Sequence, residues 1–135
     1  KIKLSPICEE VRGKRIVLID DSIVRGTTSG KIVGLLREAG QVKFNADLIA
    51  SFPHPCYYGT DIDSREHLIA CHHSIPEIAE IIGADSLGYL EIEDLAEMIG
   101  SPNFCHACFS GEYPTEIPSH TEKDRFEGPL SKKKP

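Results

Sequence analysis

Hydrophobic and polar positions follow a pattern that predicts strands and amphipathic helices in turn. The apolar run from Lys14 to Asp20 is short, β-branched and uninterrupted, which predicts a buried strand. Residues 27–39 carry apolar side chains at helical spacing and predict a helix that ends at Gly40. Residues 44–51 predict a second strand. A strand, a crossover helix and a strand in this order form a βαβ unit with parallel strands.

The second half of the chain predicts shorter elements after an irregular connection rich in proline. In order, these elements are a short helix over 64–70, a helix from a Ser74–Glu77 capping box to Gly83, a short strand over 86–90 and a helix over 91–99. The apolar faces predicted for the last two helices are Ile75, Ile78, Ala79 and Ile82, and Ile92, Leu95, Ala96 and Ile99. The chain is loop-like from Ser101 onward.

The predicted fold class is α/β, with a parallel sheet and flanking helices. Two or three strands are few for such a sheet, which is normally covered on both faces. We therefore expect partner strands elsewhere, upstream or in another chain. Residues 1–117 form the expected domain part, and residues 118–135, charged and poor in apolar side chains, form an expected disordered tail.

Composition limits the function classes. The 135 residues are 40% apolar, enough for one small domain or a fragment of a larger one. The net charge of −6 argues against a nucleic-acid partner. The absence of a long apolar stretch and of a signal peptide excludes a membrane protein and favours the cytoplasm. We interpret the first residue, Lys1, as typical of a processed or truncated product.

A candidate ligand-binding loop follows the first predicted strand. Asp20 and Asp21 stand at the expected carboxyl end of the strand, where ligands bind in open α/β sheets. Residues 22–28 are mostly small or hydroxylic, and the helix that follows, capped by Thr27 or Thr28, attracts anions. The carboxylates suit ribose hydroxyls or Mg²⁺. The alternative is an acidic turn with a threonine cap, but the complete strand–loop–helix order favours a phosphate site.

The cysteines suggest a metal. Cys105 and Cys108 form a Cys-x-x-Cys pair in a predicted loop, and Cys56 lies in another irregular segment. Thiolates so placed suit zinc or an iron–sulfur cluster, and composition alone does not choose between them. The alternative is a set of unligated thiols, since free cysteine is often buried as a small apolar residue.

These motifs carry a resemblance to a known family. Residues 17–28, Val-Leu-Ile-Asp-Asp-Ser-Ile-Val-Arg-Gly-Thr-Thr, resemble the phosphoribosyl pyrophosphate (PRPP) motif of type I phosphoribosyltransferases. The segment Ser-Ile-Val-Arg-Gly-Thr-Thr (22–28) is similar in sequence to that of the glutamine PRPP amidotransferase family. The likeness covers about residues 1–117, and its further segments are 55–62, 66–70, 82–90 and 105–114.

The resemblance implies the C-terminal part of a type I phosphoribosyltransferase domain. The family converts PRPP, glutamine and water to phosphoribosylamine, glutamate and pyrophosphate, the first step of purine synthesis. The resemblance assigns PRPP binding to Asp20, Asp21, Ser22, Ile23, Val24, Arg25, Gly26, Thr27 and Thr28, with Asp20 and Asp21 also contacting Mg²⁺. It assigns no catalytic acid or base to this chain.

The resemblance also implies a [4Fe–4S] cluster, which one branch of the family carries on four cysteines. Cys56, Cys105 and Cys108 match three ligand positions, and the fourth ligand comes from a segment upstream of this chain. Cys8 and Cys71 match no ligand position, and we expect His106 to be solvated.

The same resemblance sets expectations about partners. It implies inhibition by purine nucleotides, a homo-oligomer of the full-length enzyme, and a missing N-terminal glutaminase half. We therefore expect the chain alone not to hydrolyse glutamine and to have negligible transferase activity. The alternatives are a salvage-type phosphoribosyltransferase fragment and a non-catalytic module that binds PRPP, nucleotides or a metal.

Overall fold

A three-stranded parallel sheet forms the centre of the protein. The structure is a computed structural model, which describes residues 5–40, 43–58, 62 and 65–117. The strands β1 (Arg15–Ile23), β2 (Lys43–Ser51) and β3 (Ser86–Tyr89) are ordered β1–β2–β3, and both neighbouring pairs are parallel. The predicted βαβ unit and the short third strand are thus confirmed. The other elements are α1 (Cys8–Val11), α2 (Thr27–Glu38), η1 (Arg65–His67), η2 (Ile69–Cys71), α3 (Ile75–Ile82), α4 (Ile92–Ile99) and α5 (Ala107–Ser110).

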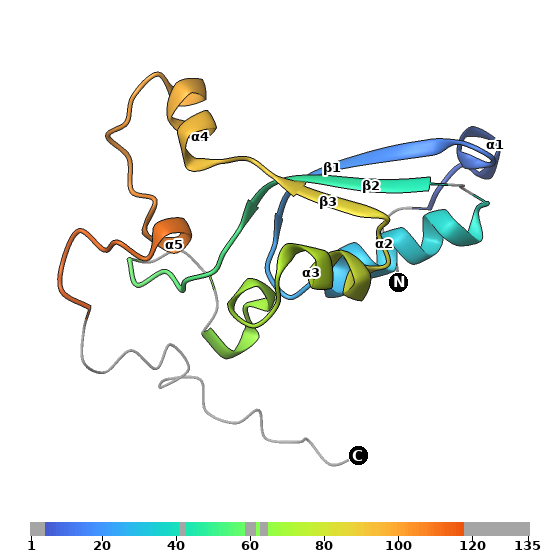
Figure 1. Cartoon of the computed structure of the whole chain (residues 1–135). Helices are drawn as coiled ribbons and strands as arrows, with labels where there is room; N and C mark the ends of the chain where they lie inside the picture. Colours follow the sequence, from blue (N-terminus) through green and yellow to red (C-terminus); the bar gives the residue numbers. More distant parts are fainter. Residues whose placement is uncertain (1–4, 41–42, 59–61, 63–64, 118–135) are drawn as a thin grey trace, which may run out of the picture.

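Two helices cover one face of the sheet. Figure 1 shows α2 and α3 side by side below the strands, while α4 and α5 lie beyond the carboxyl ends of β2 and β3. The buried apolar cluster between the sheet and these helices consists of Ile23, Val33, Ile69, Ile78 and Ile82. Each of these side chains is at most 8% exposed. The core therefore lies on the helix side of the sheet, near the end of β1.

The opposite face of the sheet is open among the described residues. Side chains along β1 alternate between half-buried and exposed positions, as expected for a strand covered on one side. Val17 is 54% exposed and Ile19 is 74% exposed. A parallel sheet normally buries both faces, so these two apolar side chains mark a face that the described residues leave uncovered.

The helix ends predicted from the sequence are largely confirmed. The backbone N–H and the hydroxyl of Ser74 both donate to the Glu77 carboxylate at 2.7 Å, which completes the predicted capping box of α3. Gly83 and Gly100 end α3 and α4 in the left-handed conformation. Ile75 and Ile99, members of the predicted apolar faces, are 47% and 58% exposed. Both lie at a helix end, where the described chain offers little to pack against.

Several boundaries differ from the prediction. β1 continues past the two aspartates to Ile23, because Ile23 itself is buried in the core and extends the pairing with β2. The segment predicted as one short helix over 64–70 contains the two 3₁₀ turns η1 and η2, although residues 63 and 64 lie outside the described ones. The short helices α1 and α5 were not predicted, because one turn leaves no apolar periodicity.

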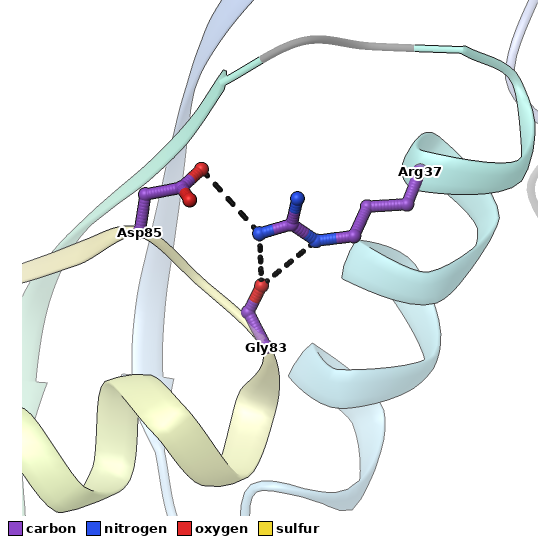
Figure 2. A network of polar contacts seen from close by, with 3 residues as sticks. All are labelled: Arg37, Gly83 and Asp85. Atoms are coloured by element: carbon purple, nitrogen blue, oxygen red, sulfur yellow. Dashed lines mark hydrogen bonds and ion pairs between the residues drawn. The ribbon is translucent and has the colours of Figure 1, made fainter.

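Arg37 links the two covering helices. Its Nε and Nη2 atoms donate to the carbonyl oxygen of Gly83 at 3.0 and 2.6 Å, and Nη2 lies 3.4 Å from a carboxylate oxygen of Asp85 (Figure 2). The guanidinium group thus satisfies a carbonyl that the end of α3 leaves without a helical partner. This contact holds the C-terminal ends of α2 and α3 together beside the start of β3.

Two expectations concern the limits of the chain. The expected tail, residues 118–135, lies outside the described residues and stays a prediction. In the part of the chain that the structure describes, no helix has the length and apolar character needed to cross a membrane.

An exposed and a buried isoleucine of β1, Ile19 and Ile23, predict different costs of truncation. We expect Ile23→Ala to lower the free energy of unfolding of the 135-residue chain by about 2–5 kcal/mol, because it opens a cavity in the core. The matched variant Ile19→Ala should change it by less than about 1 kcal/mol, because that side chain is already in water. Urea unfolding followed by circular dichroism measures both. Equal losses would contradict the burial of Ile23 in the core and the exposure of Ile19.

Candidate phosphate-binding site

The two aspartates lie within β1 rather than after it. Up to Asp21, half-buried and exposed positions alternate along β1. Asp20 continues the half-buried series of Ile16 and Leu18, and Asp21 continues the exposed series of Val17 and Ile19. Asp20 is half-buried and Asp21 is exposed. The Asp20 carboxylate accepts the backbone N–H of Asp21 at 3.0 Å, and the Ser22 hydroxyl lies 3.5 Å from the Asp21 carboxylate. The two carboxylates can therefore contact different parts of one ligand across the end of the strand.

The loop that follows turns sharply onto α2. Gly26 has φ +74° and is the N-cap residue of α2, so the predicted threonine cap was wrong. Thr27 and Thr28 form the first turn of the helix, and both are exposed. A left-handed φ is costly for any residue with a Cβ atom, which explains why glycine rather than threonine occupies the cap. Both threonine hydroxyls are thereby kept at the helix start without serving as its cap.

The start of α2 differs from the starts of α3 and α4. The side chains of Glu77 and Asp94 complete capping boxes at the latter two helices, whereas Gly26 makes no side-chain hydrogen bond to α2. The first N–H groups of a helix have no partner within it, and together with the helix dipole they attract anions. The N-terminus of α2 thus has the chemistry of a phosphate site, close in sequence to two carboxylates.

The loop rests on a segment that the sequence analysis did not connect with it. The backbone N–H of Ile69 donates to the carbonyl oxygen of Val24 at 2.9 Å. Leu68 and Ile69 are buried, and Ile69 belongs to the same apolar cluster as Ile23. The apolar residues 68–70 indicated a buried segment, but no spacing rule relates that segment to a loop so distant in the sequence.

The three cysteines singled out from the sequence lie on two segments that contact each other. Burial raises the pKa of the Cys108 thiol, and the thiolate charges of Cys56 and Cys105 raise it further, while the N–H groups of Cys108 and Phe109 lower it. The N–H of Tyr58 also donates to the Cys56 sulfur at 3.5 Å. Amide donors directed at sulfur stabilise a thiolate. Still, no group of three or more metal-ligating side chains within metal-binding reach occurs among the described residues.

The two cysteine-bearing segments are held together by backbone and aromatic contacts. The N–H of His54 donates to the carbonyl of Cys108 at 3.1 Å, and the Tyr113 hydroxyl donates to the carbonyl of Pro55 at 2.7 Å. The rings of Phe52 and Phe109 stack with centroids 5.3 Å apart. These contacts bring the segment that contains Cys56 against the segment of Cys105 and Cys108, although about fifty residues separate them in the sequence.

The remaining predicted residues behave differently. Cys108 lies in the short helix α5 and not in a loop. His106 is partly exposed, and its Nδ1 lies 3.0 Å from the Ser110 hydroxyl. The Cys71 thiol donates to the carbonyl of Pro53 at 2.8 Å, which agrees with a structural role, and Cys8 is exposed on α1.

The structure also has a concave region that contains none of the predicted site residues. Its volume is about 320 Å³, and its lining is mainly apolar and comes from the ends of β2 and β3 and from α3, α4 and α5. None of the predicted substrate or metal residues lines it. The candidate phosphate loop and this concave region are therefore separate features of the structure.

Comparisons with known proteins find similar chains and similar solved structures. No protein-family model matches the chain. The amidophosphoribosyltransferase of Bacillus subtilis is 50% identical over 127 residues, which cover 87% of this chain and 26% of that protein. The chloroplastic amidophosphoribosyltransferase 1 of Arabidopsis thaliana is 52% identical over 120 residues, which cover 86% and 21%. The solved glutamine PRPP amidotransferase of B. subtilis, complexed with ADP and GMP, superposes with a TM-score of 0.81 at 47% identity and covers 88% of this chain and 28% of its own.

The α/β fold matches part of the type I phosphoribosyltransferase domain of the solved PRPP amidotransferases. The chain is homologous to the amidophosphoribosyltransferases and matches their C-terminal portion. It spans about a quarter of the length of the curated relatives it matches.

The position of Gly26 predicts the effect of adding a side chain there. A Cβ atom on Gly26 would lie 3.0 Å from Cδ1 of Ile69, whereas Gly13, with φ +73°, has nothing within 4 Å. We expect Gly13→Ala to cost about 1–2 kcal/mol of stability from the left-handed backbone alone. Gly26→Ala should cost about 1–3 kcal/mol more, because it also crowds the core.

Urea unfolding of both alanine variants measures this difference. Equal destabilisation of the two would show that the loop does not rest closely on Ile69.

Proposed function

We propose that this chain is the PRPP-binding part of an amidophosphoribosyltransferase, the enzyme of the first step of purine biosynthesis. The observation that supports this most is the loop between β1 and α2. It joins two carboxylates to a glycine-capped helix start within a chain homologous to enzymes of that name. The complete enzyme would convert PRPP, glutamine and water to 5-phosphoribosylamine, glutamate and pyrophosphate.

Each part of the loop has a distinct role in this proposal. Asp20 and Asp21 would accept hydrogen bonds from the ribose hydroxyls and contact Mg²⁺, a cation that prefers oxygen ligands. The backbone from Ser22 to Gly26 and the hydroxyls of Thr27 and Thr28 would hold the 5′-phosphate. Since positive charge develops on the sugar ring as pyrophosphate leaves, nearby carboxylates would stabilise it. Bound Mg²⁺ would supply charge neutralisation for the leaving pyrophosphate.

The relatives suggest why the chain would act only within a larger protein. It covers about a quarter of their length, and we propose that the rest supplies a glutaminase half and further strands of the sheet. The open face around Val17 and Ile19 supports that need. The salvage-type alternative is less favoured, because the matched relatives are named amidophosphoribosyltransferases.

Regulation, assembly and location follow the relatives in the same way. The solved B. subtilis relative was complexed with ADP and GMP, which supports purine nucleotides as inhibitors of the complete enzyme. We also propose a homo-oligomer of that enzyme and a cytoplasmic location, although the named plant relative is chloroplastic.

We further propose that Cys56, Cys105 and Cys108 supply three ligands of a [4Fe–4S] cluster. The contacts between the two cysteine-bearing segments and the amide donors directed at Cys56 and Cys108 support this proposal. When bound, the cluster would cross-link the segments around Cys56 and α5 rather than take part in the transfer. The fourth ligand would come from outside this chain.

The loop assignment predicts a loss of PRPP affinity when the carboxylates are neutralised. We expect Asp20→Asn and Asp21→Asn each to weaken binding of Mg²⁺–PRPP about tenfold or more, because each removes a charged hydrogen-bond acceptor. Isothermal titration calorimetry of the chain and its variants measures this. Glu38→Gln, at the far end of α2, is the control and should leave affinity unchanged.

Two results would count against the proposal. Unchanged affinity in both aspartate variants would refute the site. Binding of Mg²⁺–PRPP by a complete protein that shows no pyrophosphate release with glutamine would favour the non-catalytic module.

The cluster proposal predicts which thiols control iron uptake. After anaerobic reconstitution with iron and sulfide, Cys105→Ala and Cys108→Ala should each retain far less iron and acid-labile sulfide than the parent, because a cluster loses affinity with each ligand removed. Cys8→Ala is the matched control, since Cys8 is exposed on α1. Stoichiometric zinc in place of iron, or equal iron in all variants, would overturn the cluster.

A further inference from the structure

One buried residue contacts the candidate phosphate loop at two points. The backbone N–H of Ile69 donates to the carbonyl oxygen of Val24 at 2.9 Å. A Cβ atom built on Gly26 would lie 3.0 Å from Cδ1 of Ile69 and 3.4 Å from Cγ2 of Ile82. The loop backbone is thus held by a hydrogen bond before Gly26 and by close packing at Gly26 itself.

Ile69 can act as a firm support because its own position is fixed. It is 8% exposed and belongs to the cluster formed with Ile23, Val33, Ile78 and Ile82. It starts η2, and Leu68 just before it is fully buried. Close-packed interiors transmit even the loss of one methylene group to their neighbours. A change in the side chain of Ile69 therefore reaches the loop backbone directly.

The orientation of that backbone matters for anion binding. Gly26 is the N-cap of α2, so its placement sets the direction of the N–H groups at the helix start. Donors bind an anion well only when they converge on it, and small displacements of binding groups lower affinity strongly. A core residue that packs against Gly26 thus determines how well these N–H groups converge on an anion.

We propose that Ile69 is a positioning residue, whose side chain and backbone N–H set the geometry of the loop that binds the 5′-phosphate. This inference rests on the proposed function for its ligand, but the contact itself does not. Ile69 acts only through its contacts with Val24 and Gly26 and not by touching the substrate.

The test compares two identical truncations in the same core. Ile69→Val removes the Cδ1 atom below Gly26 and keeps the backbone hydrogen bond. Ile78→Val removes the equivalent atom from another member of the cluster, which is 2% exposed and is not among the atoms near the Gly26 Cβ position. Both variants should lose comparable thermal stability, because both leave a cavity of one methyl group.

Two readouts separate positioning from a general structural role. We expect Ile69→Val to weaken Mg²⁺–PRPP binding by about three- to tenfold in calorimetry, because the loop donors converge less well. In NMR spectra of the free chain, it should shift the amide signals of Gly26, Thr27 and Thr28 and speed their hydrogen exchange. Ile78→Val should leave affinity and these signals as in the parent.

The outcomes are distinct. Equal effects of the two variants on affinity, or loop amides unchanged in Ile69→Val, would overturn the role of Ile69. A parent chain that does not bind Mg²⁺–PRPP would count against the proposed function instead. The amide comparison needs no ligand, so it would still decide whether Ile69 positions the loop.

Discussion

The apolar cluster of Ile23, Val33, Ile69, Ile78 and Ile82 is the interaction on which the described fold depends. Its members come from β1, α2, η2 and α3, so burying them fixes four elements against one another in a single step. The cluster lies at the carboxyl end of β1, and its members Ile69 and Ile82 pack against the turn at Gly26. Packing that stabilises the fold therefore also fixes the backbone of the candidate phosphate loop, and stability and binding share the same few side chains.

A chain of contacts continues from this cluster to the cysteines. η2 holds the loop through Ile69 and ends at Cys71, whose thiol donates to the carbonyl of Pro53. The next residue, His54, donates its N–H to the carbonyl of Cys108. The two candidate sites are thus parts of one connected structure, joined by short-range hydrogen bonds. Without an independent coupling measurement, this continuity describes support and not communication.

The sheet also shows what the described residues lack. Two helices cover one face, while Val17 and Ile19 are exposed on the other. The match with the curated relatives covers only about a quarter of their length. A half-covered parallel sheet is unusual in a complete domain, so the exposed apolar face and the coverage of the relatives point to the same need for further structure.

The sequence by itself determined the local elements and the chemistry they carry. Periodicity located the three strands and the helices α2, α3 and α4, because local spacing governs which side chains can share a face. The Ser74–Glu77 box and the terminal glycines were likewise local, and the order of residues 17–28 identified the loop. Tertiary structure alone decided the rest. It extended β1 to Ile23 and gave the cap to Gly26 instead of a threonine. It also packed Ile69 against the loop and brought the segment of Cys56 against that of Cys105 and Cys108. Each of these depends on contacts between segments far apart in the chain, and no local pattern encodes which distant surfaces will meet.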